Sequence, residues 1–264
     1  MAKLSGVQII VTRPRQQAET WAAQLSSLGA QALVSPVLEI CPLHDETAKQ
    51  RIKQTILDID QYQKIIFVSQ NAVSYGFDWM DQYWPQFPLG VSYFAVGEAT
   101  ARLAREKGLD VTEAGVAMNS EALLALKELT NVEQQKILIM RGVGGRTHLA
   151  DELSKRGAKV EYCELYQRHR PSTVLEDFKR SVELVEKDRL VLSVHSGESL
   201  ENLNEVLKCQ THSFYDTPLL VPGARVAKVA SDLGFSQVIV AMNATDKAMT
   251  QALIAWRQAH AGNA

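Results

Sequence analysis

The stretch VQIIVTRP at residues 7–14 returns later in the chain as KILIMRG at residues 136–142, and each version closes an apolar run with an arginine. A segment with helical spacing follows each version and ends in Leu-x-x-x-Gly-Ala, at residues 25–30 and 153–158. The two versions align without a gap at an offset of 128 residues. Such self-similarity indicates an internal duplication.

Two further blocks recur at nearly the same offset. IFVS at residues 66–69 is echoed by SVHS at residues 193–196, an offset of 127. VGEATA at residues 96–101 is echoed by PGARVA at residues 222–227, an offset of 126. One short block could recur by chance, but three in the same order favour a duplicated α/β unit.

Length and charge narrow the class of protein. The 264 residues suit two domains of ordinary size, each with its own core. The net charge of −2, without a long Lys/Arg run, argues against a nucleic-acid partner. No apolar run reaches the roughly 18 residues of a membrane span, and polar residues interrupt any signal-peptide core. The three cysteines are widely spaced, and we interpret them as buried, reduced thiols of a cytoplasmic protein.

Short β-branched runs alternate with amphipathic segments along the whole chain, which is typical of parallel sheets covered by helices. The predicted strands are 7–11, 32–34, 65–68, 93–96, 137–140, 160–162, 190–194, 219–221 and 238–240. A helix predicted after the first strand has one apolar face, made of Ala18, Trp21, Ala22, Leu25 and Leu28. Pro14 suits its first turn and Gly29 its carboxyl-terminal cap.

Two extended stretches, 36–42 and 163–168, fall outside this rhythm and could cross between domains. If the chain leaves the first domain near Pro36 and returns near Tyr166, the two domains are interleaved. Contiguous halves meeting near Asn131 are the alternative, but they leave both extended stretches unexplained. We therefore expect two similar α/β domains with these bounds: a first domain of 1–37 and 169–264, a second of 43–162, and linker strands 38–42 and 163–168.

Candidate ligand-binding residues lie where strands end, because open α/β sheets bind ligands beyond the carboxyl ends of their strands. Arg13 and Arg141 each end a strand before a helix, and a guanidinium beside free backbone N–H groups binds carboxylate or phosphate. The glycine-rich loop 142–146 would let backbone amides approach an anion. It is not a nucleotide fingerprint, because Thr147 replaces the third glycine. Helix capping or an ion pair is the alternative role of the two arginines.

No acid–base or metal constellation is apparent. The six histidines lack metal-ligand spacing, and His195, which ends a strand, is more typical of a structural histidine. The residues thus indicate an anion-binding cleft between two similar domains, with few groups for proton transfer.

An ordered set of weak motifs resembles the uroporphyrinogen-III synthase family over nearly the full length. The motifs are VTRP (11–14), IFVSQNAV (66–73), VGEATA (96–101), SEALL (120–124), LIMRGVGGR (138–146), YQR (166–168) and SGE (196–198). The resemblance implies two interleaved flavodoxin-like domains joined by a two-stranded linker, with the active site in the cleft. The substrate-binding candidates are then Arg13, Ser69, Gly97, Thr100, Arg141, Gly142 and Ser196.

The resemblance also implies the reaction. The substrate would be hydroxymethylbilane, a linear tetrapyrrole with an acetate and a propionate on every ring. The family expels the terminal hydroxyl, inverts the last ring through a spiro intermediate and closes the macrocycle, without a cofactor or metal. Unaided closure gives the uninverted isomer, so catalysis is mostly geometric. We expect a monomer without nucleic-acid or membrane partners, compatible with a transient hand-over from the preceding pathway enzyme.

Tyr166 is the candidate for chemical assistance. Strand alternation would put Glu164 and Tyr166 on one face and Cys163 and Leu165 on the other. A phenol is protonated at neutral pH and could donate to the departing hydroxyl. The alternative is a tyrosine that only packs between the domains.

Two features of this sequence differ from what the family resemblance implies. Many relatives carry a threonine where this chain has Val226, so a hydroxyl contact cannot be carried over there. The net negative charge requires the arginines to converge on the cleft, namely Arg13, Arg15, Arg141, Arg146 and Arg168. A non-enzymatic, two-lobed anion-binding or sensor module is the alternative function.

Overall fold

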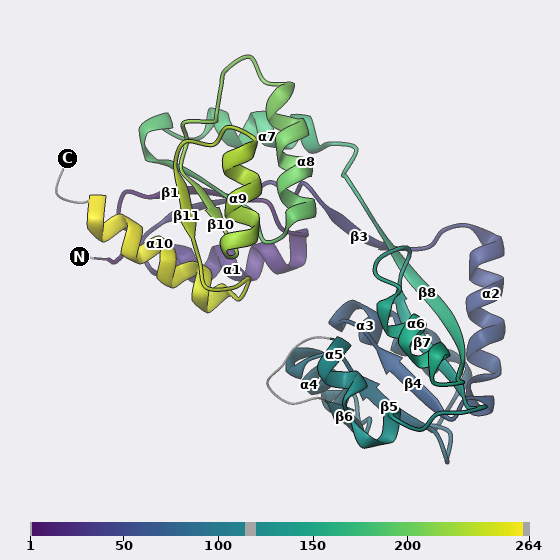
Figure 1. Cartoon of the computed structure of the whole chain (residues 1–264). Helices are drawn as coiled ribbons and strands as arrows, with labels where there is room; N and C mark the ends of the chain where they lie inside the picture. The colour runs from purple at the N-terminus through teal and green to yellow at the C-terminus, as the bar shows by residue number, and fades with distance from the viewer. Residues whose placement is uncertain (1, 114–119, 261–264) are drawn as a thin grey trace. The chain divides into compact units, whose positions relative to one another are not determined.

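The computed structural model describes residues 2–113 and 120–260, which form two compact units (Figure 1). Unit 1 consists of Met1–Glu39 and His169–Ala264, and unit 2 of Ile40–Arg168. The chain leaves unit 1 once and returns to it once, so the interleaved arrangement is confirmed. The alternative of contiguous halves meeting near Asn131 is wrong.

Unit 1 contains a five-stranded, fully parallel sheet in the order β11-β10-β9-β1-β2. Its strands are β1 (Gln8–Val11), β2 (Gln31–Val34), β9 (Leu190–Ser193), β10 (Leu219–Val221) and β11 (Val238–Val240). Its helices are α1 (Arg15–Ser27), α7 (Val174–Glu183), α8 (Gly197–Lys208), α9 (Ala224–Asp232) and α10 (Asp246–His260), with the 3-10 turn η3 (Lys187–Arg189).

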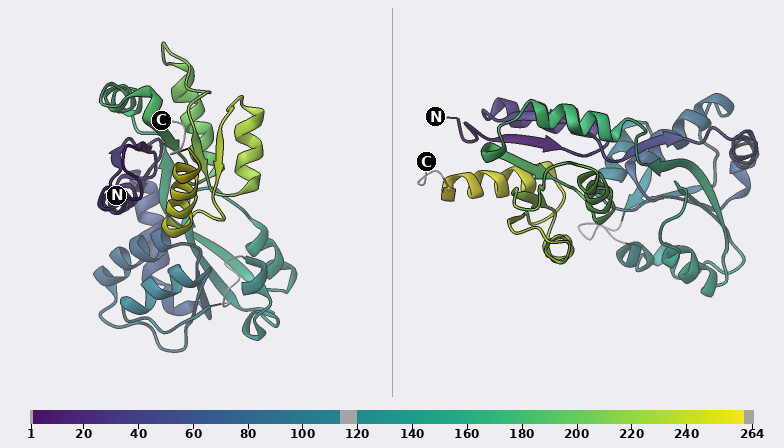
Figure 2. Two further views of the ribbon diagram at one scale, coloured as in Figure 1. Left: turned by 90° about the vertical axis from the view of Figure 1, so that its left-hand side faces the viewer. Right: turned by 90° about the horizontal axis from the view of Figure 1, so that it is seen from above.

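Strand alternation divides the core of unit 1 between the two faces of the sheet. Ile9 and Val11 pack with Trp21 under α1 and α10, whereas Ile10 packs with Phe178 on the face that α7, α8 and α9 cover. The helical face predicted for residues 18–28 is confirmed, because Ala18, Trp21, Ala22 and Leu25 are all buried. Helices thus enclose this sheet on both faces (Figure 2).

Unit 2 contains a six-stranded sheet in the order β3-β8-β7-β4-β5-β6. Its strands are β3 (Glu39–Pro42), β4 (Lys64–Phe67), β5 (Ser92–Ala95), β6 (Val111–Glu113), β7 (Lys136–Gly142) and β8 (Lys159–His169). Its helices are α2 (Glu46–Leu57), α3 (Gln70–Tyr83), α4 (Glu98–Glu106), α5 (Ser120–Leu124) and α6 (His148–Lys155), with 3-10 turns η1 (Ile59–Gln61) and η2 (Lys127–Leu129).

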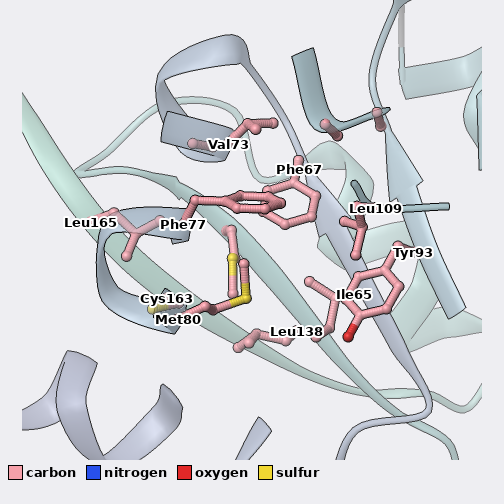
Figure 3. Packing of buried hydrophobic residues seen from close by; sticks show 14 of the residues in the cluster. Ile65, Phe67, Val73, Phe77, Met80, Tyr93, Leu109, Leu138, Cys163 and Leu165 are labelled. Atoms are coloured by element: carbon pink, nitrogen blue, oxygen red, sulfur yellow. The ribbon is translucent and has the colours of Figure 1, made fainter. Parts of the chain in front are cut away.

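The larger core of unit 2 lies between its sheet and the helices α2, α3 and α4. Phe67 from β4 and Phe77 from α3 meet with ring centroids 6.3 Å apart. Met80, Cys163 and Leu165 close the same cluster (Figure 3). Helices α5 and α6 cover the opposite face of the sheet.

Both units share one strand order. Unit 1 reads β2-β1-β9-β10-β11, and unit 2 reads β8-β7-β4-β5-β6 with β3 added at the edge. Numbered from β1 and from β7, each is the 2-1-3-4-5 order of flavodoxin-like folds. The sequence repeats therefore mark equivalent strands: β1 with β7, β4 with β9, and β5 with β10. Each half of the sequence contributes strands to both units.

All nine predicted strands are present, and seven of them agree with the observed bounds to within one residue at each end. The strands predicted at 137–140 and 160–162 are longer than predicted, as β7 and β8. The strand predicted at 160–162 continues through the extended stretch 163–168 as the single strand β8. β3 and β8 are neighbours within the sheet of unit 2, so both stretches predicted as linkers belong to a sheet. β6 was not among the predicted strands. Among the described residues, no helix is long and apolar enough to cross a membrane.

Gly108 and Gly157 offer a matched test of two helix ends in unit 2. Both residues have φ +86°, a left-handed conformation that costs other residues roughly 1–2 kcal/mol. A Cβ at Gly108 would meet nothing within 4 Å, whereas one at Gly157 would lie 3.1 Å from Cγ and 3.2 Å from Cα of Glu133. We expect Gly108→Ala to lower the free energy of unfolding by about 1–2 kcal/mol. Gly157→Ala should lower it further, which urea unfolding would measure. Equal losses would contradict the crowding at Glu133.

Candidate anion-binding site

A hollow of about 270 Å³, here called the arginine pocket, lies in unit 2 where β4, β5 and β7 end. Its lining residues are Val68, Val96, Ser120, Ile139, Arg141, Gly142, Gly144, Gly145, Arg146, Leu149, Tyr162, Tyr166 and Arg168. Three of these are arginines, and none of the described lining residues is Asp or Glu. An excess of positive charge in a hollow at strand ends is suited to binding an anion.

Arg141 organises the loop that forms one wall of this pocket. The side chain is buried, Nε donates to the carbonyl of Gly142 at 3.1 Å, and Nη1 donates to the carbonyl of Arg146 at 3.3 Å. The guanidinium lies 4.6 Å from the ring centroid of Tyr162, in cation–π range. Arg141 lies within β7, and α6 begins only at His148, so the expected junction with a helix is wrong.

The glycine loop leaves room for two guanidinium groups. A Cβ on Gly145 would lie 2.7 Å from Nη2 of Arg141 and 3.9 Å from Nη2 of Arg168. The N–H of Gly144 donates to Oε1 of Glu164 at 3.2 Å, so one loop amide already binds a carboxylate. The side chain of Arg146 is exposed and forms no hydrogen bond or ion pair within the part of the chain that the structure describes.

Tyr166 is held in the same region by three contacts. Its hydroxyl lies 2.9 Å from Oγ of Ser69, and its ring stacks on Tyr75 with centroids 5.5 Å apart and planes 24° from parallel. A Cβ on Gly142 would lie 2.5 Å from Cε2 of Tyr166, so only glycine fits beside the ring. Gly142 therefore provides clearance for Tyr166, besides lining the pocket.

The predicted face of Tyr166 is wrong. β7 and β8 pair Arg141 with Glu164 and Gly142 with Tyr166, so the register shifts by one residue there. This irregularity interrupts alternation. Tyr166 consequently packs in the same core as Cys163 and Leu165. Glu164 lies opposite Arg141 and Tyr166 opposite Gly142, the next residue of β7, so Glu164 and Tyr166 lie on different faces.

The other candidates of unit 2 lie at helix starts. Ser69 caps α3, where its Oγ accepts the N–H of Ala72 at 3.1 Å. Gly97 precedes α4 with φ +85°, a conformation that favours glycine. Thr100 is buried in the first turn of α4. Val96 lines the arginine pocket, so the start of α4 adjoins it.

In unit 1, Arg13 forms an ion pair with Asp246, and its Nη2 donates to Oε1 of Gln17 at 3.1 Å. The ion-pair role that the sequence left open is therefore present, within one unit. Ser196 caps α8 by accepting the N–H of Ser199 at 3.0 Å. Arg13 and Ser196 follow the paired strands β1 and β9, so the structure brings these two candidates to one sheet edge.

His195 lies beside them in an unusual environment. Both of its ring nitrogens are buried without a hydrogen-bond partner among the described residues, and its ring meets Trp21 edge-on at 4.8 Å. Burial, reinforced by the positive charge of Arg13, lowers the pKa of His195 to about 3. His195 is therefore neutral at neutral pH.

A larger hollow of about 720 Å³ lies at the other edge of the unit 1 sheet. Its lining includes Val7, Arg189, Pro218 and Gln237, each directly before a strand. Parallel sheets bind ligands at the carboxyl ends, so size alone does not make this hollow the functional site. Among the described residues, no group of three or more His, Cys, Asp or Glu side chains is arranged to hold a metal ion.

Sequence reasoning missed three neighbours of the candidate residues: Tyr75, Tyr162 and Asp246. The position of Tyr162 near Arg141 could have been inferred, because Tyr162 lies in β8, the strand that pairs with the strand that carries Arg141. Asp246 lies 233 residues from Arg13, and no local pattern links the two.

The fold and the pocket together define a class: a protein of two doubly wound α/β units with a cationic pocket at the strand ends of one of them. The family model described as Uroporphyrinogen-III synthase HemD matches residues 19–251. The uroporphyrinogen-III synthase of Escherichia coli (strain K12) is 31% identical over 253 residues, which cover 94% of this chain and 100% of that protein. The enzyme of Salmonella typhimurium is 31% identical over 250 residues, with the same coverage.

The chain therefore belongs to the uroporphyrinogen-III synthase family, hydro-lyases of tetrapyrrole biosynthesis. The predicted family and the enzymatic function are confirmed, in preference to the sensor module. Solved structures agree on the fold. The Helicobacter pylori enzyme has a TM-score of 0.61 at 15% identity, covering 95% of this chain and 99% of its own. A mutant enzyme of Thermus thermophilus has a TM-score of 0.58 at 16% identity, covering 97% of this chain and 100% of its own.

The environment of His195 predicts a pH-dependent stability. Its pKa is about 3 in the folded chain against an ordinary value of 6.5, so the unfolded chain binds the proton first as the pH falls. Between pH 7.5 and pH 5 this group should lower the free energy of unfolding by up to about 2 kcal/mol.

His195→Gln should remove this part of the acid destabilisation, as measured by urea unfolding at both pH values. Replacing His212, which is exposed, by Gln is the control and should keep the wild-type pH dependence. An unchanged pH dependence in His195→Gln would show that the imidazole is hydrated or paired in solution.

Proposed function

We propose that this enzyme cyclises hydroxymethylbilane, with loss of the terminal hydroxyl as water and inversion of the last pyrrole ring. The observation that supports this most is the arginine pocket, where three guanidiniums lie beside a buried phenol without a lining carboxylate. A substrate with an acetate and a propionate on every ring supplies the anions that such a pocket would bind.

The proposed binding mode gives the three arginines different tasks. Arg141 is fixed by its own hydrogen bonds to the loop, so it supplies charge from a rigid position. Arg146 and Arg168 line the same hollow and would form charge-assisted hydrogen bonds to substrate carboxylates. Arg13 is already paired with Asp246, so in this proposal it is a secondary contact of the substrate, as are Ser196 in unit 1 and Gly97 and Thr100 in unit 2.

Tyr166 is the proposed proton donor. The bond between the terminal methylene and its hydroxyl oxygen breaks, and the oxygen leaves as water with the phenol proton. Electrons of the pyrrole nitrogen stabilise the resulting cation, and a carbon of the last ring attacks the other end of the chain. In the rearrangement, the bond between this ring carbon and the preceding bridge carbon breaks, and the bridge carbon bonds to the free α-carbon of the last ring. That α-carbon loses its hydrogen as a proton, which returns to the Tyr166 oxygen, so no cofactor is consumed.

The first test is Tyr166→Phe, which keeps the ring stacked on Tyr75 and removes only the hydroxyl. Positioned proton transfer contributes about 10²- to 10⁴-fold, so we expect turnover to fall by that factor. The melting temperature should stay near that of the wild type, and the uninverted isomer should accumulate when the oxidised porphyrins are separated. Wild-type turnover in this variant would leave geometry alone to explain catalysis.

The second test concerns charge in the arginine pocket. A hydrogen bond to a charged group contributes about 1.5–3 kcal/mol. Because the substrate has redundant carboxylates, we expect the loss in Arg146→Ala to lie at the lower end of this range. The KM should therefore rise about 10-fold. Arg180→Ala removes the same charge from α7, where its side chain is 74% exposed, and is the control. Steady-state kinetics at fixed ionic strength measure both. Equal KM values for the two variants would argue against carboxylate binding by Arg146.

A further inference from the structure

Ser69 and Tyr166 form a hydrogen bond that couples the start of a helix to the candidate proton donor. Oγ of Ser69 and Oη of Tyr166 lie 2.9 Å apart, although the residues are 97 positions apart in sequence. Ser69 lies between β4 and α3, and Tyr166 lies in β8. Both belong to unit 2, so this contact is internal to one compact body.

The direction of this hydrogen bond follows from the donor and acceptor capacity that remains on each oxygen. Oγ of Ser69 accepts the N–H of Ala72 at 3.1 Å, which uses one of its two lone pairs. If the phenol of Tyr166 gives its proton to a substrate, it cannot also donate to Ser69. In the reactive arrangement Ser69 must therefore donate, and the phenol oxygen must accept.

Helix α3 adds to the effect of this donation. Its 14 residues begin directly after Ser69, and the amino-terminal end of a helix carries a partial positive charge. The hydroxyl of Ser69 is bound to the first turn through Ala72, so it would transmit this polarisation to the phenol oxygen. Negative charge on that oxygen, which develops as the proton leaves, is thereby stabilised.

The ring of Tyr166 is confined as well as its hydroxyl. Tyr75 comes from α3, the helix that Ser69 caps, and stacks on the ring. Tyr75 is itself fixed, because its hydroxyl donates to the carbonyl of Ile40 at 3.2 Å. On the side of β7, Gly142 leaves no space for even a methyl group. One helix thus positions both the ring and the hydroxyl.

We propose that Ser69 is a positioning residue for the reaction: it donates to the phenol oxygen of Tyr166, directs the phenol proton toward the leaving hydroxyl of the substrate, and stabilises the phenolate that results. This inference rests on the proposed function of Tyr166. It assigns Ser69 a role through another side chain, in place of a direct contact with the substrate.

The test is a double-mutant cycle of Ser69→Ala and Tyr166→Phe. One preorganised donor to a developing oxyanion contributes up to 10²- to 10³-fold, so we expect Ser69→Ala to lower kcat by about 10- to 100-fold with KM unchanged. In the Tyr166→Phe background the same change should lower kcat by less than about 2-fold, because the oxygen it serves is gone. Ser69→Thr keeps the hydroxyl and should retain most of the kcat.

Two further variants separate positioning from helix stability. Ser69→Gly removes the hydroxyl but remains an acceptable cap, so it should fold and show the same loss of kcat as Ser69→Ala. Asp45→Ala removes the cap of α2, where the carboxylate accepts the N–H of Ala48 at 2.7 Å. This control should lose comparable stability and keep the wild-type kcat.

Three results would overturn the inference. Equal losses in the two backgrounds would mean that Ser69 acts independently of Tyr166, and a rise in KM alone would make it a substrate contact. Wild-type kcat in Ser69→Ala while Tyr166→Phe is slow would refute the role of Ser69 and leave the proposed function standing. Wild-type kcat in Tyr166→Phe would refute both.

Discussion

One parallel ladder at the centre of each unit joins distant parts of the chain, and the rest of the structure depends on these two ladders. In unit 1, β1 pairs with β9 from Gln8 and Leu190 to Val11 and Ser193. In unit 2, β4 pairs with β7 from Lys64 and Ile137 onward. Each ladder joins strands from different halves of the sequence. Because parallel strands end at one edge, the ladders also bring together residues at or just beyond the strand ends, Arg13 with Ser196 in one unit and Ser69 with Arg141 in the other.

The two units also show how duplicated positions diverge. Arg13 and Arg141 occupy equivalent strand ends, but Arg13 is paired with a carboxylate, whereas Arg141 donates to backbone carbonyls and lies over Tyr162. Ser69 and Ser196 cap equivalent helices, yet only Ser69 contacts a phenol. The equivalent positions of the two units therefore have different contacts: an ion pair at Arg13, and backbone and aromatic contacts at Arg141.

Features with a local or periodic signature were predictable from sequence. The apolar runs predicted the strands, and the offset repeats indicated the duplication. The arginine at each strand end indicated the edge of the sheet where the candidate ligand-binding residues lie. The face of Tyr166 was predicted wrongly, because a one-residue register shift leaves no trace in the alternation of side chains. The ion pair of Arg13 with Asp246 was not predictable either, because only the completed fold brings those segments together.

The interleaved chain also imposes an order on folding during synthesis. Domains fold as units while the chain emerges from its amino terminus. Residues 1–39 are made first and contain β1 with its partner β2, but β9, the other partner of β1, belongs to the segment after residue 168. Unit 2 is complete before that segment exists. Ile9 and Ile10 therefore lack the core partners that come from the segment after residue 168 while unit 2 folds first.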